Sequence, residues 1–272
     1  TRNCTELVKY YRGKNLKLWV YIDPCNGLDR SKDATSLAAM GKSIAQAEPQ
    51  QRFRRFCFVM DSMLQPEHMG VALETNLIRG LSPDSIYQGM KAAVNGAAAD
   101  IAAYDTKTKL SVSVQVDYAW GWGGTGVYQG VEKDFTDFPF VQELGLSSYP
   151  YFVYDKAQDI PFDYYSRIIS GHLLPVFVSE GGWSSQTIGT RTQTSQKQAD
   201  YITKHLELLD NVKASGVFQL LDCDINLSAL PPGFPANIDQ FIYIGLTDTS
   251  LNAKPGLAIW EAAYQRPLVA GN

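Results

Sequence analysis

The sequence predicts an α/β fold in which helices lie outside a parallel β-sheet. Short apolar runs recur along the 272 residues, and helix-length segments separate them. A strand that is buried on both faces reads as a continuous apolar run, as in a parallel sheet. Strands that alternate with helices along the chain place the helices outside that sheet. No low-complexity linker interrupts the alternation, so we expect one domain over residues 1–272.

Six apolar runs are expected to form the strands of this sheet. The clearest is "LPVFVS", from Leu174 to Ser179, where five apolar residues stand in a row before Glu180 and two glycines. A glutamate at the tip of such a run is unusual if its only role is solubility. The six runs cover residues 16–22, 69–73, 110–116, 144–148, 174–179 and 216–221.

Helical patterns occupy the segments between the runs. A short helix-like piece covers residues 5–11, before the first run. Residues 82–84 ("SPD") offer an N-cap serine and a first-turn proline, and an alanine-rich stretch follows to Tyr104. Residues 194–214 carry apolar side chains at helical spacing. The alanine-rich stretch and residues 194–214 each lie between two predicted strands, where a helix can cross over.

The spacing of the strand ends favours a barrel. The ends lie 31 to 51 residues apart, and a (β/α)8 TIM barrel of about 250 residues averages roughly 31 residues per unit. The competing architecture, a doubly wound sheet, usually has a glycine-rich phosphate loop after an early strand, and residues 24–27 ("PCNG") are not one. Because only six strands are found, we expect the first two strands of the barrel to be absent from this sequence.

Composition excludes several classes of partner. Hydrophobic residues make up 45% of the chain and charged residues 19%, as in an ordinary globular core. The net charge is −4 and no dense basic patch occurs, so we expect no nucleic-acid partner. No stretch approaches the ~20 apolar residues that span a bilayer, so no membrane partner is expected. The four cysteines lack CxxC spacing, which argues against zinc and leaves one disulfide or free thiols open.

Acidic and aromatic residues gather where the predicted strands end, which is where βα barrels build their active sites. Two facing carboxyl groups suit glycoside hydrolysis, since one protonates the leaving oxygen and the other attacks the anomeric carbon or activates water. Aromatic rings offer flat apolar faces to sugars. The strand ends carry Asp23, Glu74, Asp117, Tyr149, Glu180 and Asp222. The loops that follow carry Tyr118, Trp120, Trp122, Tyr151, Phe152, Tyr154 and Trp183.

Three of these strand ends resemble a known family. "MGVALETN", "LGLSSYPYF" and "PVFVSEGGWSS" resemble strands four, six and seven of the clan A retaining glycoside hydrolases, which are TIM barrels. They are most similar to the arabinogalactan endo-β-1,4-galactanase family. The resemblance implies that Glu74 is the acid/base and Glu180 the nucleophile, that Tyr149 hydrogen-bonds the nucleophile, and that no cofactor is needed.

The chain also departs from the clan's pattern. Leu73 stands before Glu74 where the clan usually has an asparagine that holds the substrate's 2-hydroxyl. The last run ends "FQLLD" where a sugar-stacking tryptophan is usual, and the clan's strand-two arginine has no counterpart. These departures leave the polysaccharide open and leave room for an inactive protein.

The residues expected to bind substrate come from the same strand ends and loops. Ordinary alternatives exist for each: a carboxylate can bond loop backbone, Glu74 can simply start a helix, and Tyr149 can pack against Pro150. The expected substrate-binding residues are Tyr149, Trp183, Trp120, Trp122, Asp23, Asn76, Asp117 and Tyr151.

The sequence therefore predicts a retaining endo-β-glycosidase that hydrolyses a plant-type or microbial polysaccharide by double displacement. Glu74 is expected to be kept protonated by a less polar pocket and by the second carboxylate, while Glu180 stays ionised. Because polysaccharides are met outside the cell, we expect a secreted protein. The alternative from another class is a catalytically inactive barrel that binds carbohydrate or acts as a scaffold.

Overall fold

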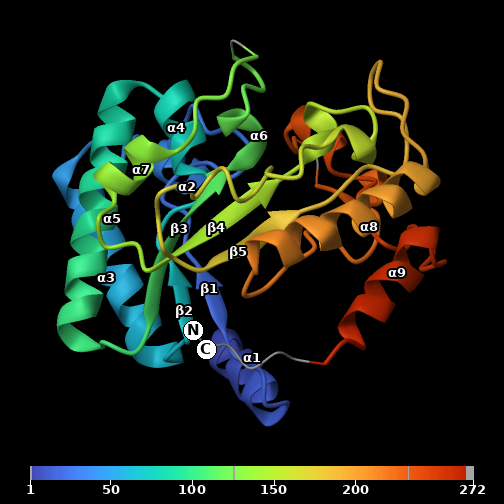
Figure 1. The fold of residues 1–272 in the computed structure, drawn as a ribbon. Helices are drawn as coiled ribbons and strands as arrows, with labels where there is room; N and C mark the ends of the chain where they lie inside the picture. The colour runs from blue at the N-terminus through green and yellow to red at the C-terminus, as the bar shows by residue number, and fades with distance from the viewer. Residues whose placement is uncertain (1, 125, 232, 268–272) are drawn as a thin grey trace. The chain divides into compact units, whose positions relative to one another are not determined.

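The computed structural model describes residues 2–124, 126–231 and 233–267 (Figure 1). These residues form two compact units. The first unit contains the described residues up to Gln115 together with Val131–Gly145, and the second contains Val116–Gly130 together with the described residues from Leu146 onward. The expectation of one barrel domain over residues 1–272 stays a prediction.

The first unit is built on parallel strands. β1 (Trp19–Tyr21), β2 (His68–Gly70) and β3 (Lys109–Gln115) lie side by side in chain order, and both strand pairs are parallel. The start of β4 (Glu143–Ser148) comes next in the order. β3 is buried from Leu110 to its end, so both of its faces are covered. The burial of β3 includes Ser111, Ser113 and Gln115, so both faces of this strand are covered although its sequence alternates apolar and polar residues.

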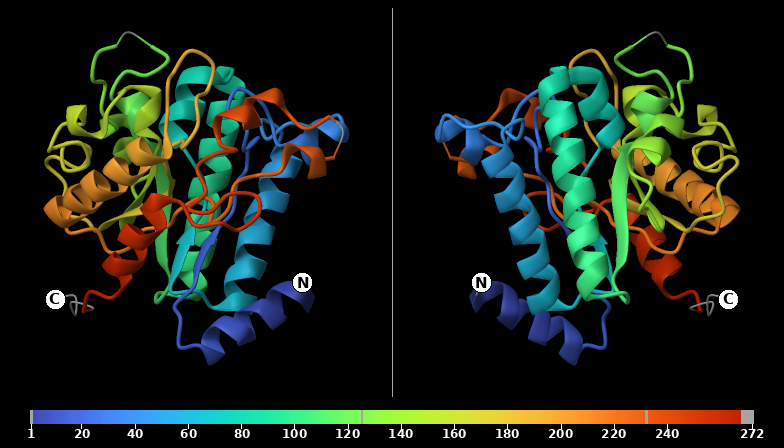
Figure 2. Two further views of the ribbon diagram at one scale, coloured as in Figure 1. Left: turned by 90° about the vertical axis from the view of Figure 1, so that its right-hand side faces the viewer. Right: turned by 90° about the vertical axis from the view of Figure 1, so that its left-hand side faces the viewer.

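Helices cover this sheet, as the alternating pattern predicted. α3 and α5 run side by side (Figures 1 and 2). They are joined by an ion pair in which Arg54 of α3 donates to Asp100 of α5 at 2.8 Å. Gly89 of α5 lies against the backbone before α3, where a Cβ atom would come within 2.4 Å of the Ile44 carbonyl oxygen. The helices of this unit are α1 (Arg2–Gly13), α2 (Thr35–Ala39), α3 (Ala47–Leu64), α4 (Thr75–Leu81), α5 (Asp84–Tyr104) and α7 (Glu132–Asp137).

The second unit contains the end of β4 and β5 (Val176–Gly181), which are neighbours in the sheet order. Its long helix α8 (Ser195–Val212) begins where the sequence predicted, because the Thr194 hydroxyl accepts the Lys197 N–H at 3.1 Å as an N-cap. α8 packs against α9 (Pro255–Tyr264). The other helical segments are α6 (Val116–Ala119), η1 (Pro150–Phe152), η2 (Ala157–Asp159), η3 (Leu227–Ala229) and η4 (Ala236–Gln240).

The prediction of a sixth strand over residues 216–221 is wrong. This segment runs parallel to β5 but forms one isolated bridge, between Val217 and Val178. Phe218 and Leu220 are 40% and 39% exposed, so the run is apolar without being buried on both faces. β5 also starts two residues later than predicted, since Pro175 has no N–H to give to a ladder.

None of the helices in the described part of the chain is both long enough and apolar enough to cross a membrane.

Candidate functional site

Glu74 lies in a tight turn between β2 and α4. It is the residue before the first turn of α4, and its backbone has the left-handed values φ +50° and ψ +47°. Its N–H donates to the Ser113 hydroxyl at 2.9 Å, which ties the turn to β3. Left-handed backbone is uncommon for residues other than glycine and persists where neighbouring structure enforces it. Glu74 is therefore both the residue at which α4 starts and the residue expected to be the acid/base.

A buried arginine joins Glu74 to Asp23. Arg30 is 5% exposed; its Nε donates to Glu74 Oε2 at 2.7 Å and its Nη1 donates to Asp23 Oδ2 at 2.5 Å. Burial raises the pKa of Asp23, while the Arg30 charge acts in the opposite direction. The carboxylate of Glu74 thus has a charged partner at one of its oxygens, and the expectation of a less polar pocket that keeps it protonated stays a prediction. Sequence reasoning placed Asp23 at the strand end but missed Arg30.

Asn76 has a structural partner on β3. Its Nδ2 donates to the Gln115 carbonyl oxygen at 2.9 Å, and its Oδ1 accepts the Gln115 N–H at 2.8 Å. The side chain is 1% exposed. Both ends of the amide therefore fasten α4 to the end of β3, and this structural role corrects the expected substrate contact of Asn76.

Glu180 lies in β5 and is half-buried. Ser147 of β4 donates its hydroxyl to Glu180 Oε1 at 2.9 Å. The glycine after Glu180 is explained by the same pair of strands: a Cβ atom at Gly181 would lie 2.6 Å from the Ser148 carbonyl oxygen. The "EGG" sequence thus places a carboxylate beside β4 at a point where the two backbones lie close together.

Asp117 is fully buried in the second unit and holds the loop after β4. Its Oδ2 accepts the Tyr149 N–H at 2.7 Å, and its Oδ1 accepts the Tyr164 hydroxyl. Asp117 therefore bonds the backbone of a loop, which was the ordinary alternative to the expected substrate contact. This finding corrects the expected contact. Tyr149 is itself 3% exposed and packs edge-on against Phe241 at 5.0 Å.

Trp183 and Tyr151 are core residues, which corrects their expected contact with sugar. The Trp183 indole is fully buried, donates to Gln193 Oε1 at 2.8 Å, and stacks on Tyr201 with ring centroids 5.2 Å apart. Tyr151 is 2% exposed and donates its hydroxyl to the Gln240 carbonyl oxygen at 2.6 Å. Neither ring presents a face to solvent.

Trp120 and Trp122 are the predicted aromatic contacts that stay partly exposed. Trp120 stacks on Tyr164 at 5.3 Å, and the Arg167 guanidinium lies 5.2 Å from its ring. Trp122 stacks on Phe152 with centroids 4.6 Å apart and an interplanar angle of 16°. Trp122 is the better candidate for a sugar platform, because fewer ring contacts hold it.

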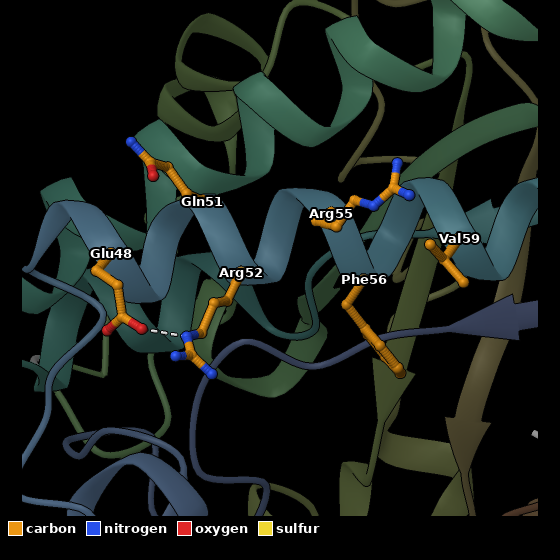
Figure 3. Close-up of a pocket in the computed structure, with 6 residues that line it drawn as sticks. All are labelled: Glu48, Gln51, Arg52, Arg55, Phe56 and Val59. Carbon is orange, nitrogen blue, oxygen red and sulfur yellow. Dashed lines mark hydrogen bonds and ion pairs between the residues drawn. The ribbon is translucent and has the colours of Figure 1, made fainter.

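A surface hollow elsewhere in the first unit is not part of this site. It lies on the outer side of α3, and the residues that line it all project from that one helix (Figure 3). Within the described part of the chain, no group of three or more His, Cys, Asp or Glu side chains is arranged to hold a metal ion. The described cysteines are free thiols, and burial raises the pKa of Cys25 and Cys57 to about 12.

Comparison with known proteins identifies the fold. No protein-family model and no curated protein sequence matches the chain. The GH53 catalytic domain of Ignisphaera aggregans is similar in structure, with a TM-score of 0.64 and 13% identity over 94% of this chain and 76% of that one. A fungal β-1,4-galactanase gives a TM-score of 0.62 and 12% identity over 94% of this chain and 81% of its own.

A third similar structure is a β-glucuronidase of an uncultured Clostridium species, with a TM-score of 0.61 and 12% identity. The match covers 96% of this chain and 42% of that protein, so the chain spans less than half of its length. These likenesses confirm the predicted fold class, an α/β fold of parallel strands that matches part of a TIM barrel. The GH53 catalytic domain and the fungal galactanase share this fold with the chain.

Proposed function

We propose that this protein is a retaining endo-β-glycosidase with Glu180 as its nucleophile and Glu74 as its acid/base. The observation that carries the proposal is the position of Glu180, a half-buried carboxylate near the C-terminal end of β5 that is held by a hydrogen bond. Strand ends of this kind are where TIM-barrel enzymes place catalytic groups. The fold likeness to a GH53 catalytic domain and a fungal β-1,4-galactanase supports the assignment.

The proposed reaction runs in two displacements. Glu180 attacks the anomeric carbon while Glu74 gives a proton to the glycosidic oxygen, so the C–O bond breaks and a glycosyl-enzyme forms. Glu74 then takes a proton from water, which attacks the anomeric carbon and releases Glu180. This chemistry requires the two carboxyl groups to lie about 5–5.5 Å apart, and it needs no metal or organic cofactor.

The proposed substrate is a β-linked plant-type or microbial polysaccharide, and we place β-1,4-galactan first among the candidates. The name of the similar fungal galactanase supports this choice. Trp122 offers a partly exposed ring for a sugar face. Because polysaccharides are met outside the cell, a polysaccharide substrate also supports the proposal that the protein is secreted.

A catalytically inactive, carbohydrate-binding or scaffold protein is the second candidate. The ion pair between Arg30 and Glu74 favours it, because one carboxylate oxygen of Glu74 is already bound by a partner inside the protein. In that case oligosaccharides would bind without being hydrolysed.

A substrate panel with one variant separates the two candidates. Purified protein is incubated with β-1,4-galactan, β-mannan and β-glucan, and new reducing ends are measured, while binding is followed by calorimetry. We expect hydrolysis of one polysaccharide and a loss of kcat on the order of 10³-fold or more in Glu180→Gln. Near-normal turnover in Glu180→Gln would exclude the nucleophile, and binding without hydrolysis in the wild type would establish the second candidate.

A further inference from the structure

We propose that Ser147 is a positioning residue for Glu180. The inference rests on the proposed function, and it adds a residue to the nucleophile's machinery that the strand-end pattern did not identify. Ser147 is fully buried in β4. Its hydroxyl oxygen lies 2.9 Å from Glu180 Oε1, a normal length for a hydroxyl that donates to a carboxylate.

The bond joins two neighbouring strands directly. Ser147 lies one residue before the end of β4, and Glu180 lies one residue before the end of β5. Each side chain therefore starts from a backbone that a ladder holds in place, and a short serine side chain has a single rotatable bond before its hydroxyl. A donor fixed in this way limits rotation of the Glu180 carboxylate about its last C–C bond.

That restraint serves the displacement chemistry. A carboxylate that attacks the anomeric carbon has to present one oxygen along the line of the breaking bond. The Ser147 hydroxyl keeps the carboxylate plane in one orientation, and its hydrogen bond is strengthened by the negative charge. When the glycosyl-enzyme breaks down, the same hydroxyl is in place to stabilise the carboxylate that leaves.

The adjacent residue provides a matched control. Ser148 is also fully buried in β4, but successive side chains of a strand point to opposite faces. Its hydroxyl lies 2.9 Å from the Tyr165 hydroxyl instead of facing Glu180. Ser147→Ala and Ser148→Ala therefore remove the same group, at the same depth, from the same strand, and only one of them changes the surroundings of the nucleophile.

The experiment compares these two variants with Glu180→Gln on one hydrolysed aryl β-glycoside, by kcat, KM and the pH profile of kcat/KM. For Ser147→Ala we expect kcat to fall roughly 10- to 100-fold, as for a lost hydrogen bond to a charged group, with KM within about twofold of wild type. We expect the acidic limb of the pH profile to move in Ser147→Ala. Ser148→Ala should keep the wild-type kcat and pH profile, while its thermal midpoint should fall by several degrees.

A second substitution guards against misfolding. Ser147→Cys keeps the size of the side chain but replaces the hydroxyl with a weak donor, so it should show the same loss of kcat as Ser147→Ala. Wild-type kcat in Ser147→Ala or Ser147→Cys would overturn the positioning role, and so would an equal loss in Ser148→Ala. If one of these results is obtained while Glu180→Gln abolishes turnover, only the role of Ser147 fails and the proposed function still stands. If Glu180→Gln itself turns over normally, the proposed function fails and the role of Ser147 fails with it.

Discussion

Arg30 and Glu74 form a buried ion pair, with Arg30 Nε 2.7 Å from Glu74 Oε2, although the two residues are 44 positions apart in the sequence. The same guanidinium holds Asp23. The loop after β1 and the turn after β2 are thereby fixed to each other around one positive charge. The orientation of the proposed acid/base thus depends on a residue that lies outside any recognised motif.

Removing the charge of Arg30 should lower the free energy of unfolding. Arg30→Met would leave two carboxylates close together without their cation, and breaking a buried pair in this way costs about 3–5 kcal/mol. Urea denaturation of the wild type and the variant measures the difference in the free energy of unfolding. Arg30→Lys keeps the positive charge but loses the paired donors of the guanidinium. Its free energy of unfolding should therefore lie between those of the wild type and Arg30→Met. A loss below about 1 kcal/mol in Arg30→Met would show that the pair does not hold the turn.

Gly181 should not tolerate a side chain. In Gly181→Ala the new Cβ atom would meet the Ser148 backbone carbonyl oxygen at 2.6 Å, so β4 and β5 would have to separate. Overpacking of this kind typically costs about 1–3 kcal/mol. Gly13→Ala is the control, because a Cβ atom there meets nothing within 4 Å. Equal unfolding midpoints for the two variants would contradict the close approach of the strands.

His205 should make stability depend on pH. Burial lowers its pKa to about 3, and its Nδ1 lies 2.5 Å from the Tyr201 hydroxyl. The unfolded chain binds this proton near pH 6.5, so the stabilising effect is complete above that pH and is lost as pH falls toward 3. The slope approaches about 1.4 kcal/mol per pH unit within this window.

Urea denaturation at pH 7 and pH 5 tests this dependence. In His205→Gln, which does not titrate but keeps a polar group beside Tyr201, the contribution of residue 205 to the pH dependence should vanish. A His205→Gln variant that loses stability between pH 7 and pH 5 as steeply as the wild type would rule out a role for this histidine.

Trp122 should contribute to substrate binding if it is a sugar platform. Trp122→Ala removes the ring that stacks on Phe152, and we expect KM for the hydrolysed polysaccharide to rise roughly 3- to 10-fold, as for a stacking contact of about 0.5–1.5 kcal/mol. Phe218→Ala, which removes another partly exposed ring of the same unit, serves as the control. An unchanged KM in Trp122→Ala would assign the ring to packing with Phe152 alone.

The sequence predicted the strands that are buried on both faces and failed where burial was partial. β5 begins as a continuous apolar run and β3 alternates valine with buried serine, and both strands were predicted. Residues 216–221 also form an apolar run, but Phe218 and Leu220 are exposed. An apolar sequence does not show which other residues cover each face of a segment. α5 and α8 were predicted, because helical periodicity is a local signal. Thr194 caps α8 at its expected start, but the expected Ser82 cap is wrong, since α5 begins at Asp84 without a side-chain cap.

The site was predicted less completely, because residue type does not show whether a polar or aromatic group faces solvent. Asn76, Asp117 and Trp183 all follow predicted strands, yet each is buried with a partner inside the protein. Arg30 was missed for a related reason: its partners are brought together by the fold, and a lone arginine in a loop carries no pattern. Ser147 is one of two neighbouring serines on β4, and the sequence does not show which of them faces Glu180.

The most direct test of the central claim is to identify the residue that becomes glycosylated. A 2,4-dinitrophenyl 2-deoxy-2-fluoro-β-glycoside of the hydrolysed sugar forms the glycosyl-enzyme with loss of dinitrophenolate, and the fluorine slows its hydrolysis. Peptide mapping by mass spectrometry then locates the label. We expect one sugar per chain, on Glu180, and none in Glu180→Gln. A label on another residue, or turnover of substrate without any label, would contradict it.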